Sequence, residues 1–247
     1  MAAVVPHADE IPPGYGYRPA RTPFATIVWW AHIEWDGVYT DAANEFWGLS
    51  FGLAADGSPS ATLIGPSMRP RTMELPAGER AWGIELAPHV FVRGIRVKPI
   101  DEFLALDTDG QWFVLAGTRY PVPSLDDLER LVTALAAQGI LVSEPLVERA
   151  LSGLPVPGAD RTVRRMVSET TGLGRKNVAQ LRRARHAYRL LHSGMPPAQA
   201  AVAAGYTDQS HMTRDFRLFA GSTPGRILRG TEASPFDSRD VADSSNP

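Results

Sequence analysis

Hydrophobic positions recur with two different periods along this chain of 247 residues. Positions 27, 29, 31, 33 and 35 carry Ile, Trp, Ala, Ile and Trp, an alternation that predicts a β-strand with one buried face. Short apolar runs separated by segments rich in Gly and Pro continue to residue 122. This pattern predicts a β-rich domain over residues 1–122.

From residue 123 the apolar spacing changes to three and four, which is typical of helices. Ser124 is the expected N-cap of a helix that connects the two halves over residues 123–143. The apolar stripe of this helix is wide, so the helix can pack on the β-rich domain or pair with a second subunit, and we favour packing within the chain. The stripe consists of Leu125, Leu128, Leu131, Val132 and Leu135.

Residues 144–230 predict several helices separated by Gly and Pro. A short helix near residues 144–151 is followed by one with Asp160 as N-cap and Gly172 at its end, and then by a long helix over 175–192. At 1.5 Å per residue the long helix spans roughly 27 Å, which is comparable with the ~34 Å between successive major-groove faces of B-DNA. One chain can therefore place two reading helices in adjacent grooves.

Residues 201–226 have the pattern of a helix, a glycine turn and a second helix. Gly205 can take the positive φ that a reversal requires, and Asp208 or Thr207 can cap the next helix. Apolar residues of this helix recur at Met212, Phe216 and Phe219, and a last short helix begins at Thr223 and Pro224. The polar residues that fall off the apolar stripe are expected to face outward and read base edges. They are Gln209, Ser210, His211 and Arg214.

Charge is divided unevenly along the chain, although the total is only −2. Residues 1–158 carry a net −8, residues 159–230 a net +9 and residues 231–247 a net −3. Twelve of the thirteen basic residues in 159–230 are arginines, whose planar fork suits phosphates and guanine. Four of them, at 182, 183, 185 and 189, lie on the long helix and are expected to divide between phosphates and solvent. This basic block predicts a DNA-binding domain.

The segment from about 144 to 230 resembles the DNA-binding domain of the AraC (arabinose regulator) family of bacterial transcription factors. The residues that carry the resemblance are Ala201, Gly205, Tyr206, Asp208, Gln209, Ser210, His211, Arg214, Phe216, Gly221, Thr223 and Pro224, together with Thr162, Arg165 and Gly172. The resemblance implies two helix-turn-helix units joined by a long helix. It assigns DNA contacts to Arg161, Thr162, Arg164 and Arg165 in the first unit, and to Gln209, Ser210, His211 and Arg214 in the second, with Thr213 and Arg217 on phosphates.

The amino-terminal region more weakly resembles the β-barrel, cupin-like sensor domains that precede such readers. That resemblance implies a domain that binds a small effector, dimerises, or both. Trp29, Trp47 and Trp82 are candidates for the wall of an effector pocket, although packing in a core also accounts for tryptophans. The fold class expected for the whole chain is α+β, with the β-rich domain followed by an all-α domain.

Several kinds of chemistry receive no support from the sequence. The chain has no cysteine, and its six histidines have no metal-ligand spacing, so we expect no metal and no cofactor. No apolar run is long enough to cross a membrane, and the start lacks a signal sequence, so we expect a cytoplasmic protein. The acidic tail, residues 231–247, is expected to be disordered.

The predicted function is sequence-specific binding of double-stranded DNA by a transcriptional regulator, an activator or a repressor. RNA polymerase, a small effector and a second copy of the chain are its further expected partners. One alternative is an amino-terminal domain that binds no ligand and contacts only a partner protein or a second copy of the chain. Another is an enzymatic barrel, for which Glu34, Asp36, Asp41 and Glu45 could supply an acid and a base, but no nucleophile or phosphate loop accompanies them.

Overall fold

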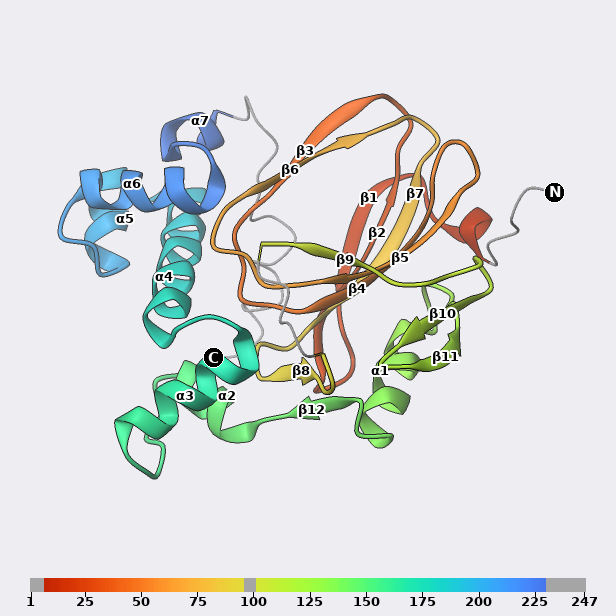
Figure 1. The fold of residues 1–247 in the computed structure, drawn as a ribbon. Helices are drawn as coiled ribbons and strands as arrows, with labels where there is room; N and C mark the ends of the chain where they lie inside the picture. The colour runs from red at the N-terminus through yellow and green to blue at the C-terminus, as the bar shows by residue number, and fades with distance from the viewer. Residues whose placement is uncertain (1–6, 96–100, 230–247) are drawn as a thin grey trace.

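The computed structural model describes residues 7–95 and 101–229, and it has a β-rich amino-terminal part followed by an all-α part (Figure 1). The fold class expected from the sequence is confirmed. The strands are β1 (Gly14–Pro19), β2 (Ala25–His32), β3 (Gly37–Asp41), β4 (Gly48–Leu53), β5 (Pro59–Ile64), β6 (Arg71–Leu75), β7 (Arg80–Leu86), β8 (Val90–Val92), β9 (Phe103–Ala105), β10 (Trp112–Leu115), β11 (Thr118–Pro121) and β12 (Leu141–Ser143). The helices are η1 (Ala8–Glu10), α1 (Leu128–Ala137), α2 (Pro145–Leu151), α3 (Asp160–Thr171), α4 (Arg175–His192), α5 (Pro197–Ala203), α6 (Gln209–Ala220) and α7 (Pro224–Leu228).

The amino-terminal part is built on an antiparallel six-stranded sheet with the order β1-β2-β7-β4-β5-β9. In its register Trp30 lies opposite Trp82, and Trp82 lies opposite Phe51, so these side chains share one face. That face packs against α1 and the β10–β11 hairpin and forms the first apolar core. Its most deeply buried members include Val28, Leu49, Phe51, Leu63, Trp82, Ile84, Phe113, Leu128 and Val132.

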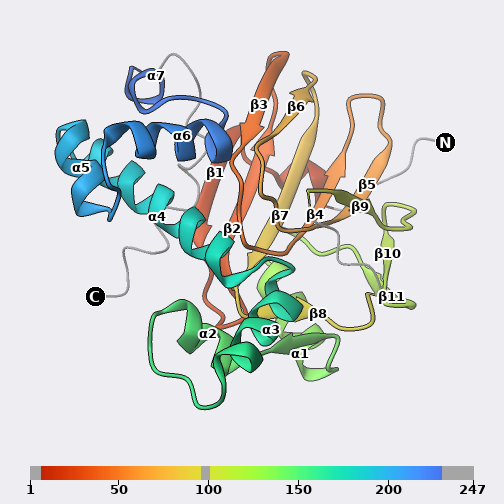
Figure 2. The same cartoon turned by 60° about the vertical axis from the view of Figure 1, so that its left-hand side comes forward.

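The opposite face of the sheet is covered by the two-stranded ribbon of β3 and β6, which lies across it in both views (Figures 1 and 2). Both faces of β2 are therefore covered, and the prediction of one buried face was wrong. The strand also ends at His32, so Trp35 lies beyond it and is 82% exposed. The alternation continued past the strand because Ile33 still faces inward while the chain turns toward β3.

The helix expected over residues 123–143 is shorter in the structure. Its N-cap is Asp127, whereas the Ser124 hydroxyl accepts a hydrogen bond from the Asp127 amide at 3.1 Å and stabilises the preceding turn. The chain then returns as β12, which pairs with β8 of the β-rich part. Leu128, Val132 and Leu135 are buried in the first core, so α1 packs within the chain as expected. The expected acidic tail lies outside the described residues.

The helical part is arranged along α4, with α2 and α3 at one end and α5, α6 and α7 at the other (Figures 1 and 2). Its apolar residues form a second core. The core includes Val163, Val167, Val178, Leu181, Ala184, Tyr188, Leu191, Met212, Phe216 and Phe219, and also Ala42 and Ala43 from the β-rich part. The two parts of the chain therefore share one packed core at their junction.

Local capping explains where α3 and α6 begin and end. The N-cap of α3 is Ala159, not Asp160 as predicted, because the Asp160 carboxylate pairs with Arg164 within the helix. Gly172 ends α3 with a φ of 75°, and Gly205 turns the chain between α5 and α6 with a φ of 80°. Of the two expected N-caps of α6, Asp208 and Thr207, the structure has Asp208, whose carboxylate accepts a hydrogen bond from the His211 amide at 2.7 Å.

Replacing Asp208 with Ala should destabilise the protein by about 1 kcal/mol, because the first turn of α6 loses its side-chain acceptor. Chemical denaturation followed by circular dichroism measures this loss. Asp126→Ala removes an exposed carboxylate that caps no helix, and it should leave stability within about 0.5 kcal/mol of the parent. Equal stability of the Asp208 variant and the parent would contradict the capping role.

Candidate DNA-binding site and its link to an amino-terminal cavity

Helix α6 presents a polar face at one end of α4. Gln209, Ser210, Arg214 and Arg217 are exposed on it, whereas Met212, Phe216 and Phe219 are buried in the second core. The apolar side fixes the rotation of the helix about its axis, so the polar side chains must face solvent. This is the arrangement in which a short helix can enter the major groove and offer Gln and Arg to base edges.

Two of the residues expected on this face are partly occupied by contacts within the protein. His211 is half-buried, and its ring packs edge-on against Tyr206 with the centroids 5.1 Å apart. Thr213 is also half-buried, and its hydroxyl donates to the Gln209 carbonyl at 2.9 Å. His211 is therefore less exposed than Gln209, Ser210 and Arg214, because its ring packs on Tyr206.

Helix α3 presents the second polar face, at the other end of α4. Arg161, Thr162, Arg164 and Arg165 are all exposed. Arg164 binds the Asp160 carboxylate, and this hydrogen bond holds the pKa of Asp160 below its usual value. Arg161 and Thr162 have no such contact among the described residues, so both remain accessible to a ligand.

The arginines of α4 have a structural role that the sequence did not reveal. Arg183 pairs with buried Asp215 of α6 at 3.0 Å and stacks over the Tyr206 ring at 4.3 Å. Burial raises the pKa of Tyr206, so its hydroxyl stays neutral in this setting. The expectation that these arginines divide between phosphates and solvent was therefore wrong for Arg183, which fixes α6 against α4.

Two further arginines of α4 bind a carboxylate from the β-rich part. Glu45 is fully buried; its Oε2 lies 2.9 Å from Arg185 Nη2, and its Oε1 lies 3.2 Å from Arg182 Nε. Burial alone would raise the pKa of Glu45, but the charges of Arg185 and Arg182 lower it to about 2. The carboxylate is therefore ionised at neutral pH, and it joins the two parts of the chain.

Glu45 belongs to a stretch, residues 42–47, that we call the bridging segment. Its odd-numbered residues each contact a different helix. The Ala43 amide donates to the Phe219 carbonyl of α6 at 2.7 Å, and the Trp47 indole donates to the Thr170 carbonyl of α3 at 3.2 Å. Together with Glu45 on α4, the bridging segment contacts both candidate reading helices and the helix between them.

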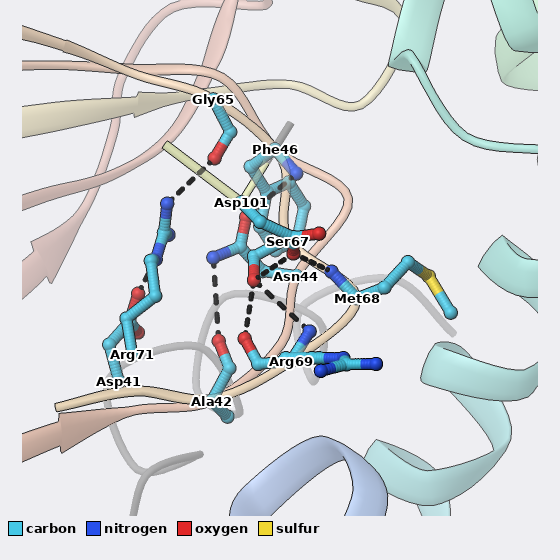
Figure 3. A network of polar contacts seen from close by, with 10 residues as sticks. All are labelled: Asp41, Ala42, Asn44, Phe46, Gly65, Ser67, Met68, Arg69, Arg71 and Asp101. Atoms are coloured by element: carbon cyan, nitrogen blue, oxygen red, sulfur yellow. Dashed lines mark hydrogen bonds and ion pairs between the residues drawn. The ribbon is translucent and has the colours of Figure 1, made fainter. Parts of the chain in front are cut away.

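A polar network holds the bridging segment in place (Figure 3). Asn44 and Ser67 exchange backbone hydrogen bonds at 2.9 and 2.8 Å, and the Ser67 hydroxyl donates to Asp101 at 2.8 Å. At the start of the segment, buried Arg71 donates to Asp41 and to the Gly65 carbonyl, both at 3.0 Å. The segment therefore has a fixed conformation even though it lies outside any strand.

A cavity of about 420 Å³ lies between the six-stranded sheet and the β3–β6 ribbon. It exists because the strands present small residues there, among them Ala31, Gly48, Ser50, Ser60 and Ala81. Asn44, Phe46 and Trp47 of the bridging segment line one end of it. The same segment therefore borders the cavity and contacts the helical part.

Of the three candidate tryptophans, two line the cavity and one does not. Trp47 lies at the end near the bridging segment, and Trp29 lies so close over Gly83 that a Cβ on that glycine would meet the indole at 2.7 Å. Trp82 is buried on the other face of the sheet, where its indole donates to the Pro123 carbonyl at 3.0 Å. The assignment of Trp82 to a pocket wall was wrong, since alternation places it in the core.

The carboxylates considered for catalysis have structural contacts instead. Asp36 accepts the Ala77 amide at 2.8 Å, and Asp41 and Glu45 are bound by arginines. Within residues 7–95 and 101–229, no group of His, Asp and Glu could hold a metal ion. Over the same residues no helix is long and apolar enough to cross a membrane.

Comparison with known proteins identifies the helical part. Residues 159–230 match a family model described as a helix-turn-helix domain. The structure of ToxT from Vibrio cholerae aligns over 87% of this chain and 98% of its own, with 10% identity and a TM-score of 0.41. An apo variant of ToxT from Vibrio cholerae strain SCE256 aligns over 86% and 99%, with the same identity and TM-score. No curated protein matches the chain.

The resemblance to the AraC type is confirmed for residues 159–230. The matched residues contain α3, α4, α5, α6 and α7. The protein is a DNA-binding transcription regulator.

Replacing Glu45 with Gln should destabilise the protein by about 3 kcal/mol or more, because buried Arg185 loses its countercharge. Denaturant titration monitored by the fluorescence of the tryptophans measures the change. Glu169→Gln is the matched control, since Glu169 lies 4.0 Å from Arg165 on the surface and the change should cost less than about 0.5 kcal/mol. Similar losses for the two variants would contradict the role of Glu45.

The ion pairs of Glu45 also predict how the free energy of unfolding depends on pH. A carboxyl whose pKa falls from 4.5 to about 2 on folding contributes stability that is complete above pH 4.5 and is lost as the pH falls toward 2. The parent should therefore lose more unfolding free energy between pH 5 and pH 3, on the order of 1 to 2 kcal/mol, than Glu45→Gln does. Parallel pH profiles for parent and variant would contradict this assignment.

Proposed function

We propose that the protein binds a specific operator by placing α3 and α6 in adjacent major grooves of one DNA duplex. The observation that carries this proposal is the position of two exposed polar helix faces at opposite ends of α4. The α4 helix of eighteen residues spans roughly 27 Å, which suits two successive turns of B-DNA. A net charge of +9 over residues 159–230 supplies attraction to phosphates.

Within this proposal the exposed side chains have different roles. Gln209, Ser210 and Arg214 read base edges from α6, where His211 supports the helix and reaches DNA only at its edge. Arg217 and Thr213 contact phosphates. On α3 the corresponding readers are Arg161, Thr162, Arg164 and Arg165, with Arg164 exchanging its bond to Asp160 for one to DNA.

We further propose that the amino-terminal domain senses a small effector. The support is the bridging segment: Phe46 and Trp47 border the cavity, while Ala43, Glu45 and Trp47 contact α6, α4 and α3. A ligand that packs against Phe46 acts on a segment that is hydrogen-bonded to both reading helices. The effect on DNA affinity follows from any difference in ligand affinity between the free and DNA-bound conformations.

The second candidate role is a domain without a ligand that binds only a partner or a second copy of the chain. It differs in expecting that no small molecule changes DNA affinity, and the cavity favours the sensing role. Recruitment or exclusion of RNA polymerase and formation of a homodimer belong to the proposal, as does a cytoplasmic location, because a regulator of this class acts on the chromosome.

Selection from random duplex DNA by the full-length protein tests the proposal. We expect enriched sites with two conserved blocks about one helical turn apart and an affinity that falls steeply with salt, with a slope of about −0.9 per phosphate neutralised. Enrichment of a single block would mean that only one unit reads DNA. Binding without any sequence preference would overturn the proposal.

Replacing Arg214 or Gln209 with Ala should weaken binding to the selected site by about 1 to 3 kcal/mol each, because a pair of hydrogen bonds to a base edge is lost. Fluorescence anisotropy with labelled duplexes measures the loss, and binding to random DNA should change far less. Arg130→Ala is the control, since it removes one exposed positive charge from the amino-terminal domain. If both α6 variants bound as tightly as Arg130→Ala, α6 would not read bases.

A further inference from the structure

The chemistry of the cavity is more specific than its size. The walls carry six aromatic residues: Tyr15, Trp29, Tyr39, Phe46, Trp47 and Phe103. The rings of Tyr15 and Tyr39 stack with their centroids 6.2 Å apart. Aromatic rings have electron-rich faces, so such walls attract apolar groups and also cations.

The charges that line the cavity have one sign. Asp41, Glu74, Glu79 and Glu85 contribute to its walls, and none of its described lining residues is Lys, Arg or His. The charge of Asp41 is balanced by Arg71, which lies 3.0 Å away. An anionic ligand would therefore meet repulsion from the remaining carboxylates.

Glu79 is the carboxylate with the clearest need of a countercharge. It is half-buried just before β7, where its carbonyl accepts the Ile33 amide at 2.9 Å. Burial raises the pKa of Glu79, and no ion pair to its carboxylate occurs within the described part of the chain. A cation at this position would compensate a carboxylate that is already partly removed from water.

The position of Glu79 also orients a ligand. Glu79 directly precedes β7 and Glu85 lies near its end. Six residues of extended chain correspond to roughly 20 Å between their backbones. Gly48 lies opposite Glu85, so the bridging segment borders that end of the cavity, while Glu79 lies at the other end. A ligand with its charge at Glu79 therefore extends an apolar body toward Phe46 and Trp47.

We propose that the cavity binds an apolar organic cation, an ammonium group on an aliphatic or aromatic body, with the ammonium held by Glu79 and the body packed against Phe46 and Trp47. This inference rests on the proposed sensing role of the cavity. A volume of about 420 Å³ suits one ligand of this kind. The class of effector follows from the sign of the charge and the aromatic walls.

The test compares three probes that share one body: decyltrimethylammonium, decanol and decanoate. Titration calorimetry with the full-length protein, below the micelle concentration of each probe, gives their affinities. We expect the ammonium to bind at least about tenfold more tightly than the alcohol, and the carboxylate more weakly than either, because the ammonium is attracted by the carboxylates and by the aromatic faces. Binding of decanol or decanoate as tight as that of the ammonium would overturn the proposal.

Glu79→Gln separates the charge from the shape of the cavity. It should weaken binding of decyltrimethylammonium by about tenfold, because the attraction between opposite charges is lost, and it should leave binding of decanol unchanged, which also shows that the cavity is intact. Asp126→Asn, which removes an exposed carboxylate from α1's side of the sheet, is the matched control and should bind both probes like the parent. Unchanged binding of the ammonium by Glu79→Gln would overturn the assignment to Glu79.

The same preparations distinguish this inference from the proposed function. DNA binding to the selected operator is measured without any probe. If the protein binds the operator specifically but shows no preference for the ammonium, only the inferred class of effector is contradicted. If the protein prefers the ammonium but binds DNA without sequence preference, only the proposed sequence-specific binding of DNA is contradicted.

Discussion

The buried carboxylate of Glu45 is the interaction on which the arrangement of the whole chain depends. It is fully buried and pairs with buried Arg185 and with Arg182, which is partly exposed, and an unpaired charge at the position of Glu45 or Arg185 would be very unfavourable. Because the two buried charges, Glu45 and Arg185, each require the other, the position of α4 against the β-rich part is strongly specified. The apolar contacts of Ala42 and Ala43 add stabilisation at the same junction, but they are less directional.

The cavity and the DNA-binding helices are connected by the same short stretch of chain. Small residues on one face of the sheet leave the cavity open, and the β3–β6 ribbon closes it from the other side. The bridging segment then runs between this cavity and the helical part, held by the network around Ser67 and Asp101. The cavity and the helical part are thus neighbours in space, although their residues are distant in the sequence.

The parts of the fold that depend on local sequence could be predicted. The turn at Gly205, the cap at Asp208 and the length of α4 follow from backbone preferences and apolar spacing within a few residues. The partners of Glu45 could not be predicted, since they lie 137 and 140 positions away and are brought together only when the two parts dock. The position of Glu45, an acidic residue directly before the apolar Phe46 and Trp47, was the available sign of a buried carboxylate. Trp29 and Trp82 were equivalent in the sequence because alternation alone does not say which face of a sheet borders a cavity.

The contacts of the bridging segment have a consequence for the geometry of operators. Ala43 is bonded to α6 and Trp47 to α3, so the distance between the two reading helices is set partly from outside the helical part. If α3 and α6 read one operator as proposed, the spacing between its two blocks is a property of the full chain. On that proposal, residues 144–229 alone, released from these bonds, would tolerate a wider range of spacings than the full chain.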